Sequence, residues 1–302
     1  MGGLPRRSLL VGGVGAAVVA AAGGAGYELV QTGIVPGRYQ LDRVLGACGA
    51  DPGVPGVAAG AVIASSFASR YRKRDVEMII MQPPGPVGPL PVALVLHGAG
   101  GDARSAISLG YPQYLAAAAA RGGATRFAAV SVDGGGSAYW HRRGDGDDPQ
   151  AMLIHEVLPR LGRQGFLTSK IGLIGWSMGG YGALLLASVL GPTRVAAVAV
   201  SSPAIYASYA AAISANQDSF DSPADFAVND LSSRARLTTL RRVACRIDCG
   251  STDPFAAQSA ALRGSLGNPA GAVSPGCHDQ AFWRRSLPAE LGFLGQHLTP
   301  LA

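Results

Sequence analysis

The chain has 302 residues, of which 48% are hydrophobic and only 15% are charged, so it has the composition of a protein with a large core and not of a disordered chain. Its formal net charge of +6 comes almost entirely from arginines, which are scattered in ones and twos without interleaved aromatic residues. We therefore expect a solvated basic surface and no nucleic-acid partner.

The N-terminal residues 1–26 have the features of an export signal. Arg6 and Arg7 precede an apolar run that is rich in glycine and alanine, as in a bacterial twin-arginine signal, and Ala20–Ala22 offers a small-residue cleavage point. The run is short for a membrane-spanning helix, although an uncleaved anchor remains the alternative. We predict an exported, extracytoplasmic protein, with association to a membrane or cell envelope through the N-terminus as the second alternative.

Residues 27–58 are rich in proline and glycine, with one short helical candidate at Tyr39–Leu45. We interpret them as a leader that packs onto a single domain, residues 59–302. That domain begins with two expected strands, Gly60–Phe67 and Val76–Met81, which we predict to form an antiparallel pair at the edge of a sheet. The following prolines end the pattern, because proline cannot donate a hydrogen bond to a strand neighbour.

From Pro91 onward, short apolar runs alternate with helix-length segments, which predicts a mostly parallel sheet with helices on both faces. The expected strands are Val92–Leu96, Phe127–Val132, Ile171–Ile174, Val195–Val200 and Val243–Ile247. Apolar residues at helical spacing predict a helix over Ala151–Leu161. Residues 203–240 are too long for an ordinary connection, so we expect a small helical insertion that overhangs the sheet as a cap.

The sequence Gly175-Trp176-Ser177-Met178-Gly179 lies between an apolar strand and a helical segment, which is the context of a nucleophile elbow. The outer glycines are needed because the turn brings the two backbones so close that a Cβ atom would clash. The serine at the tip then exposes its hydroxyl, and we predict that Ser177 is a nucleophile. In a chain with 43 glycines, the alternative is a Gly/Ser turn without chemistry.

A serine nucleophile needs a base that is oriented by a third group. After an elbow of this type, the acid and then the histidine follow the serine along the chain. Only His278 and His297 come after Ser177, and His297 ends an amphipathic terminal helix, so we predict His278 as the base. We prefer Asp253 as the acid because it lies in a loop beyond its strand, whereas Asp248 is still at the strand. A helix N-cap is the alternative role of Asp253.

The expected strand Val92–Leu96 ends in His97-Gly98-Ala99-Gly100-Gly101, where glycines allow the backbone to approach a substrate. We predict that an oxyanion is stabilised by the N–H of Met178, directly after the nucleophile, and by the N–H of Ala99. His97 precedes this turn and is expected to be a hydrogen-bonded core histidine.

A second loop follows the expected strand Phe127–Val132 and should reach the same edge of the sheet. Its residues Trp140 and His141 are candidates for substrate binding, and the alternative is that their aromatic rings pack the loop. Trp176 of the elbow is a third candidate. No ligand spacing indicates a metal site, and we expect no metal and no cofactor.

The four cysteines fit an exported protein with disulfides better than a zinc site, because no C-x-x-C spacing is present. They are Cys48, Cys245, Cys249 and Cys277. Sequence alone does not choose among the pairings. A bridge such as Cys249–Cys277 or Cys48–Cys249 would hold the predicted site loops together, and buried free thiols are the alternative.

Taken together, the G-W-S-M-G-G, H-G-A-G-G, C-G-S-T-D-P-F and G-C-H-D-x-x-F-W-R segments resemble the α/β-hydrolase fold, and within it the "putative esterase" group. That group includes S-formylglutathione hydrolase (esterase D) and the mycobacterial mycolyltransferases. The resemblance covers roughly residues 91–298. It implies acyl-ester chemistry through Ser177, Asp253 and His278, while the H-G-A-G-G loop differs from the H-G-G-G of many lipases and the substrate stays open.

The sequence thus predicts an exported serine esterase that acts on small-molecule or lipid and glycolipid esters through an acyl-enzyme. The first alternative is an acyltransferase, which would pass the acyl group to a sugar or lipid hydroxyl of the cell envelope instead of to water. A second alternative, from a different class, is a non-catalytic envelope-binding module built on a hydrolase fold.

Overall fold

A computed structural model describes residues 41–42, 44–86 and 88–298 of the chain. The predicted export segment 1–26 lies outside these residues, as do positions 39, 40 and 43 of the expected leader helix Tyr39–Leu45. Across the described ranges, no helix combines the length and apolar character that crossing a membrane requires.

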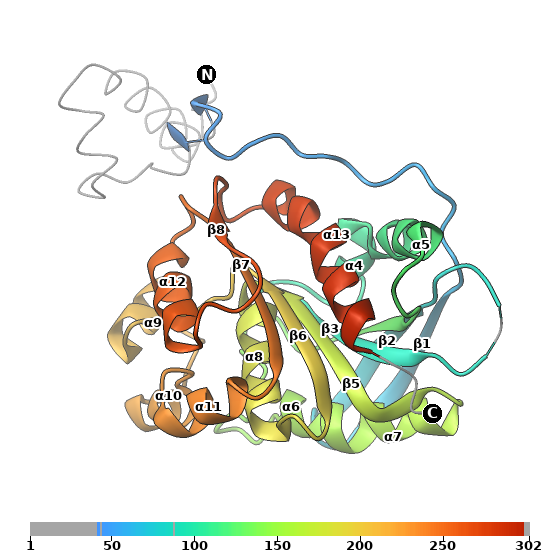
Figure 1. Ribbon diagram of the computed structural model, residues 1–302. Coiled ribbons are helices and arrows are strands. Elements are labelled where there is room, and N and C mark those ends of the chain that lie inside the picture. Colours follow the sequence, from blue (N-terminus) through green and yellow to red (C-terminus); the bar gives the residue numbers. More distant parts are fainter. Residues whose placement is uncertain (1–40, 43, 87, 299–302) are drawn as a thin grey trace, which may run out of the picture.

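A sheet of eight strands forms the centre of the molecule, in the order β1-β2-β4-β3-β5-β6-β7-β8 (Figure 1). The strands are β1 (Val62–Ser69), β2 (Arg74–Met81), β3 (Pro91–Leu96), β4 (Ala128–Val132), β5 (Leu167–Trp176), β6 (Val195–Ser201), β7 (Ala244–Gly250) and β8 (Val273–Ser274). Strands β1, β2 and β4 pair antiparallel, and every other pairing is parallel. The mostly parallel sheet is therefore confirmed, and only β1 of the antiparallel pair lies at the edge.

Ten α-helices of the described residues surround this sheet. They are α4 (Ser105–Leu109), α5 (Tyr111–Arg121), α6 (Pro149–Met152), α7 (Leu158–Arg163), α8 (Met178–Leu190), α9 (Tyr209–Ala215), α10 (Pro223–Asn229), α11 (Arg234–Leu240), α12 (Ala256–Ser265) and α13 (Gln280–His297). A π-helical turn at Leu153–Val157 joins α6 to α7, so the helix expected over Ala151–Leu161 is one almost continuous element.

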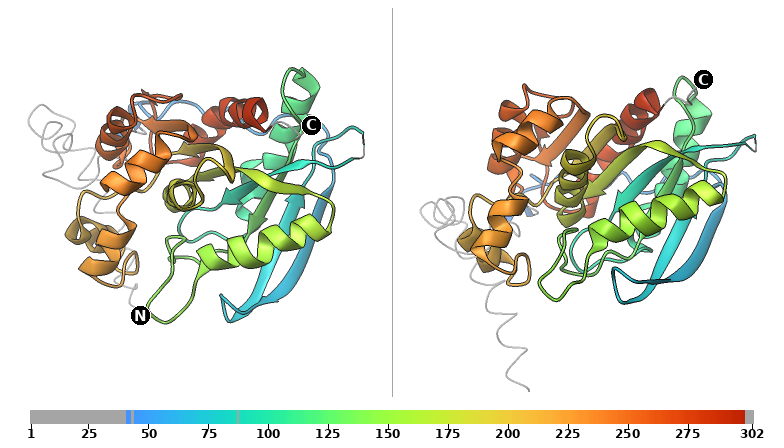
Figure 2. Two further views of the ribbon diagram at one scale, coloured as in Figure 1. Left: turned by 60° about the horizontal axis from the view of Figure 1, so that its bottom comes forward. Right: turned by 90° about the horizontal axis from the view of Figure 1, so that it is seen from below.

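Helices cover both faces of the sheet, as expected for buried parallel strands. Successive side chains of β3 point to opposite faces: Leu94 joins a core that includes residues of α6, α7 and α8, whereas Val95 joins a core built with α4, α5 and α13. Figures 1 and 2 show these two helix layers on either side of the strands. Every residue of β3 is buried, which matches its uninterrupted apolar sequence.

The segment after β6 forms the three short helices α9, α10 and α11, where the sequence predicted a helical insertion. It packs on α8: the Tyr181 hydroxyl donates a 2.8 Å hydrogen bond to the Asn229 carbonyl, and Arg236 donates to the Ser188 hydroxyl at 2.8 Å. Helix α8 is consequently buried from Met178 to Ser188, which explains why it is apolar on all sides.

Candidate active site

The turn between β5 and α8 has the conformation of a nucleophile elbow. Ser177 adopts φ 54° and ψ −125°, a backbone conformation that residues other than glycine rarely adopt. A Cβ atom on Gly175 would lie 2.5 Å from the Gly179 carbonyl oxygen, and one on Gly179 would lie 1.9 Å from the Leu96 carbonyl oxygen. Both outer glycines are therefore required by backbone contact, as the motif predicted.

The backbone of Ser177 is fixed on both sides of the turn. Its N–H donates to the Ser201 carbonyl of β6 at 3.1 Å, and its own carbonyl accepts from the N–H groups of Tyr181 at 3.1 Å and Ala204 at 2.9 Å. The residue is 9% exposed. The strained serine is held by the sheet, by its own helix and by the start of the insertion.

The structure brings Ser177, His278 and Asp253 into one hydrogen-bonded series. His278 Nε2 lies 2.9 Å from Ser177 Oγ, and His278 Nδ1 lies 2.8 Å from Asp253 Oδ2. A carboxylate only accepts hydrogen bonds, so Nδ1 carries the proton and Nε2 is free to accept one from the serine hydroxyl. The Asp253 side chain is fully buried, while that of His278 remains 22% exposed.

Asp253 lies two residues before Phe255, the N-cap of α12, so it does not take the N-cap role that was considered as its alternative. Its Oδ1 accepts a hydrogen bond from the Phe255 N–H at 2.8 Å, next to the start of α12, while Oδ2 faces the histidine. Asp248 lies within β7 and pairs with Arg246 at 2.7 Å. The carboxylate in the loop after β7, and not the one in the strand, reaches His278.

Aromatic side chains surround the imidazole. The rings of Phe255 and Trp283 each lie 5.3 Å from the His278 ring, at steep interplanar angles of 64° and 90°. Trp283 belongs to α13, whose N-cap Asp279 accepts from the Phe282 N–H at 2.9 Å. The cap places the start of α13 directly after His278, and the two rings restrict how the imidazole can turn.

The His97–Gly101 loop runs against the elbow. A Cβ atom on Gly98 would lie 3.3 Å from the Ser177 Cβ, so the loop backbone passes beside the nucleophile. Within residues 41–42, 44–86 and 88–298, the Ala99 N–H has no hydrogen-bond acceptor. Met178 is the first residue of α8, and N–H groups at that position have no acceptor within the helix. Among the described residues, the N–H groups of Ala99 and Met178 are therefore available to donate hydrogen bonds to an oxyanion.

The His97 side chain connects this loop to the loop that follows β4. The Gly134 N–H donates to His97 Nε2 at 3.0 Å, so Nδ1 carries the proton and donates to the Gly98 carbonyl at 2.9 Å. Burial lowers the pKa of His97, which keeps the ring neutral. A second bond, from the Gly100 N–H to the Gly136 carbonyl at 2.8 Å, links the same two loops. The residue occupies a structural position, as the sequence predicted.

Trp140 and His141 are in the core and offer almost no surface to a substrate. Trp140 is 1% exposed, and its indole N–H donates to the His97 carbonyl at 3.2 Å. His141 is 2% exposed and stacks on Phe220 with ring centroids 5.2 Å apart. Trp176 is also buried, between Tyr111 and Trp283. Trp140 and His141 thus have the packing role that was the alternative to substrate binding, and Trp176 is buried as well.

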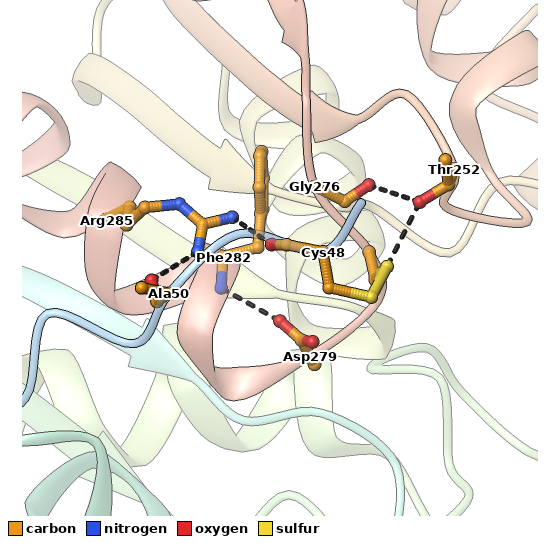
Figure 3. Close-up of a disulfide and its surroundings, with 8 residues drawn as sticks. Cys48, Ala50, Thr252, Gly276, Asp279, Phe282 and Arg285 are labelled. Carbon is orange, nitrogen blue, oxygen red and sulfur yellow. Dashed lines mark hydrogen bonds between the residues drawn. A yellow bond between two sulfur atoms is a disulfide. The ribbon is translucent and has the colours of Figure 1, made fainter. Parts of the chain in front are cut away.

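A disulfide joins Cys48 to Cys277, the residue before His278 (Figure 3). Neither of the two bridges named from the sequence forms, because Cys245 and Cys249 are buried free thiols on β7. The leader is further held by Arg285, which donates to the carbonyls of Cys48 and Ala50, at 2.7 Å in each case. The leader is therefore attached to the loop that carries the histidine.

The acid loop contacts the same disulfide. The Thr252 hydroxyl donates to the Gly276 carbonyl at 2.7 Å and lies 3.1 Å from the Cys277 sulfur, as Figure 3 shows. Thr252 precedes Asp253, and Cys277 precedes His278. The loops of the acid and the base are thus connected one residue behind the Asp253–His278 hydrogen bond.

Thiol titration should report this pairing. Burial raises the pKa of Cys245 and of Cys249 to about 12, so we expect neither to react in the native protein and both to react after denaturation. All four cysteines should react after denaturation and reduction together. Removing the bridge in the Cys48→Ser/Cys277→Ser variant, which opens a sequence separation of 229 residues, should lower the free energy of unfolding by roughly 4–5 kcal/mol. A peptide map that linked Cys249 to Cys277 would contradict the structure.

Glu290 is a buried carboxyl group behind the elbow that the sequence analysis missed. The Ser201 hydroxyl donates to its Oε1, and the Ser201 carbonyl accepts from the Ser177 N–H. Burial raises the pKa of Glu290 to about 8, and the negative charge of Asp248 acts in the same direction. A charged residue inside an amphipathic helix gives no signal in the sequence that it faces the sheet.

The protonation of Glu290 makes stability depend on pH. The folded protein retains this proton above the ordinary pKa of 4.5, so the stabilisation is complete below that value and is lost as the pH rises through about 8. Chemical denaturation between about pH 5 and pH 9 should show the free energy of unfolding falling by a few kcal/mol. Glu290→Gln, which imitates the protonated group, should remove most of that slope. An unchanged slope would show that Glu290 is ionised in the fold.

The order of the sheet, with a strained serine between β5 and α8, defines the chain as an α/β hydrolase. Residues 69–294 match the model of the family described as "Putative esterase". The chain belongs to this family and is a carboxylic ester hydrolase.

Solved structures agree on the fold. A ferulic acid esterase superposes with a TM-score of 0.67 at 20% identity, covering 80% of this chain and 99% of its own. The S-formylglutathione hydrolase of Agrobacterium tumefaciens superposes with a TM-score of 0.65 at 16% identity, covering 82% of this chain and 99% of its own. MPT51 of Mycobacterium tuberculosis superposes with a TM-score of 0.60 at 18% identity, covering 80% of this chain and 100% of its own. No curated protein matches the chain significantly.

Proposed function

We propose that the chain is an exported serine esterase that uses Ser177, His278 and Asp253 as a catalytic triad. The observation that carries the proposal is the hydrogen-bonded series from Ser177 Oγ through the imidazole to the buried Asp253 carboxylate, at 2.9 and 2.8 Å. These distances and this tautomer are what a general base needs to accept the serine proton.

In the proposed reaction, Ser177 Oγ attacks the ester carbonyl carbon while His278 Nε2 takes the hydroxyl proton. Asp253 keeps the imidazole in its tautomer and stabilises the imidazolium. The oxyanion accepts hydrogen bonds from the N–H groups of Met178 and Ala99. Collapse of this intermediate releases the alcohol, which receives the proton from His278. Water then attacks the acyl-enzyme carbonyl while His278 takes a proton from it. The carboxylic acid leaves, and Ser177 Oγ regains its proton from His278.

Two observations support export. Arg6 and Arg7 precede an apolar run, and a disulfide between Cys48 and Cys277 is stable in an oxidising compartment. We propose that residues 1–26 direct the chain out of the cytoplasm, where the bridge forms after transport. Comparing the mass of the secreted protein with that of the full chain tests whether the signal is removed.

A polar cavity favours acyl transfer to a hydroxyl group as the second candidate. Its volume is about 340 Å³, and its lining includes Arg74, Arg143 and four aspartates. It adjoins the oxyanion loop, because Gly136 in its wall accepts the Gly100 N–H. Product analysis with an acyl ester, with and without a sugar acceptor, separates the candidates: free acid alone supports hydrolysis, and an acylated sugar supports transfer. The non-catalytic alternative has no support in a family of esterases.

A further inference from the structure

An apolar groove lies between the insertion and α12. Its volume is about 260 Å³. Its apolar lining consists of Ile205, Tyr206, Leu231, Ala257, Ala261 and Leu262. The insertion contributes the residues just before α9 and those between α10 and α11, and α12 contributes the facing wall. No element of the proposed chemistry uses this groove.

The wall of the groove is connected to the residue that carries the nucleophile through the backbone. Ala204, whose N–H donates to the Ser177 carbonyl at 2.9 Å, is followed directly by Ile205 and Tyr206 in the groove wall. The Tyr206 ring contacts that of Phe255 at 5.3 Å, and Phe255 in turn contacts His278 at 5.3 Å. Two successive ring contacts therefore connect the imidazole to the groove wall.

The lining fits an uncharged hydrocarbon chain. Positions 257, 258, 261, 262 and 265 follow one face of α12, and the alanines at 257 and 261 leave space above the helix. The only charged residue in the lining, among the residues that the structure describes, is Asp230. Its carboxylate accepts from the Ser232 N–H at 2.8 Å and from the Ser232 hydroxyl at 2.6 Å, so it is occupied within its own turn.

A pair of tyrosines separates this groove from the polar cavity. The hydroxyls of Tyr139 and Tyr206 lie 2.7 Å apart, and burial raises the pKa of both groups, so both stay neutral. Tyr139 follows Ala138 in the wall of the polar cavity, whereas Tyr206 lines the apolar groove. An ester could therefore place an apolar acyl part in the groove and a polar alcohol part in the polar cavity.

We propose that the groove is the acyl-binding site and that it favours longer apolar acyl groups over acetyl. This inference rests on the proposed function. The groove's volume of about 260 Å³ is larger than an acetyl group fills, so a longer acyl chain gains apolar contacts there that acetyl does not. Each methylene that enters the groove adds binding energy to the acylation step.

The test compares p-nitrophenyl acetate with p-nitrophenyl octanoate and measures the ratio of their kcat/KM values. For the wild type we expect the octanoyl ester to be favoured by roughly tenfold or more. Ala261→Trp fills the groove and should lower the octanoyl-to-acetyl ratio by roughly 10–100-fold. The matched control is Ala260→Trp, an exposed position of the same helix outside the groove, which should keep the wild-type ratio.

The outcomes distinguish the two proposals. If the wild type cleaves acetyl esters and labels with a fluorophosphonate, but the ratio is the same in Ala261→Trp and wild type, the acyl groove is wrong and the esterase stands. A ratio that falls equally in Ala260→Trp also overturns the groove, since the effect then comes from the helix surface. If no ester is cleaved and no label attaches, the proposed function fails, and the acyl groove fails with it.

Discussion

Replacing Ser177 with alanine is expected to lower kcat for acyl esters by on the order of a millionfold. The substitution removes the hydroxyl oxygen that lies 2.9 Å from His278 Nε2, and no acyl-enzyme can form at this residue without that oxygen. Binding of the ester should change little, because the groove and the backbone donors are intact. Steady-state hydrolysis of p-nitrophenyl octanoate gives the measurement, with circular dichroism as the check that the variant is folded.

The matched control for this variant is Ser108→Ala. Ser108 is exposed and its hydroxyl makes only a long 3.5 Å contact with the Arg104 carbonyl, so its loss should leave kcat within about twofold of the wild type. Residual ester cleavage by Ser177→Ala at more than about a hundredth of the wild-type rate would place the nucleophile elsewhere.

The second large effect is expected for Asp253→Asn, which should lower kcat about 10⁴-fold. The amide that replaces Oδ2 cannot both accept the Nδ1–H and stabilise the imidazolium, so the histidine is free to adopt the wrong tautomer. The side chain is fully buried, so no solvent replaces the lost charge. Hydrolysis of the same ester reports the loss.

Asp279→Asn is the control for this change, because it makes the same substitution next to His278. Asp279 caps α13 by accepting the Phe282 N–H at 2.9 Å, and asparagine is an equally good N-cap. We expect this variant to keep most of its activity. If Asp253→Asn were as active as Asp279→Asn, the acid that orients His278 would have to be another group.

Much of the fold follows from local sequence. The spacing of apolar runs after Pro91 matches β3 to β7, because strands buried on both faces must be continuously apolar. Five residues were enough to predict the position of the elbow, because the close backbone contacts at positions 175 and 179 leave no space for any residue larger than glycine. The choice of His278 and Asp253 depended only on chain order and on which loops end strands, and the structure brings both to Ser177.

Other features depend on contacts that no local pattern contains. The partner of Cys277 is 229 residues away, and loop entropy alone does not select among four cysteines. Strand β8 has two residues, too short for a periodic signal. Trp140 looked like a residue of a rim loop, but Gly182 leaves a space in α8 that its indole fills: a Cβ atom there would lie 2.4 Å from the Trp140 Cβ.

The most direct test of the account is the mapping of a fluorophosphonate adduct on the wild-type chain. A strained serine that shares a hydrogen bond with His278 Nε2 should react with the probe, and peptide mass spectrometry should find the added mass on the peptide that contains Ser177. Esterase activity should disappear in proportion to labelling. Full inactivation with the adduct on a different residue, or full esterase activity after Ser177 is labelled, would contradict the central claim.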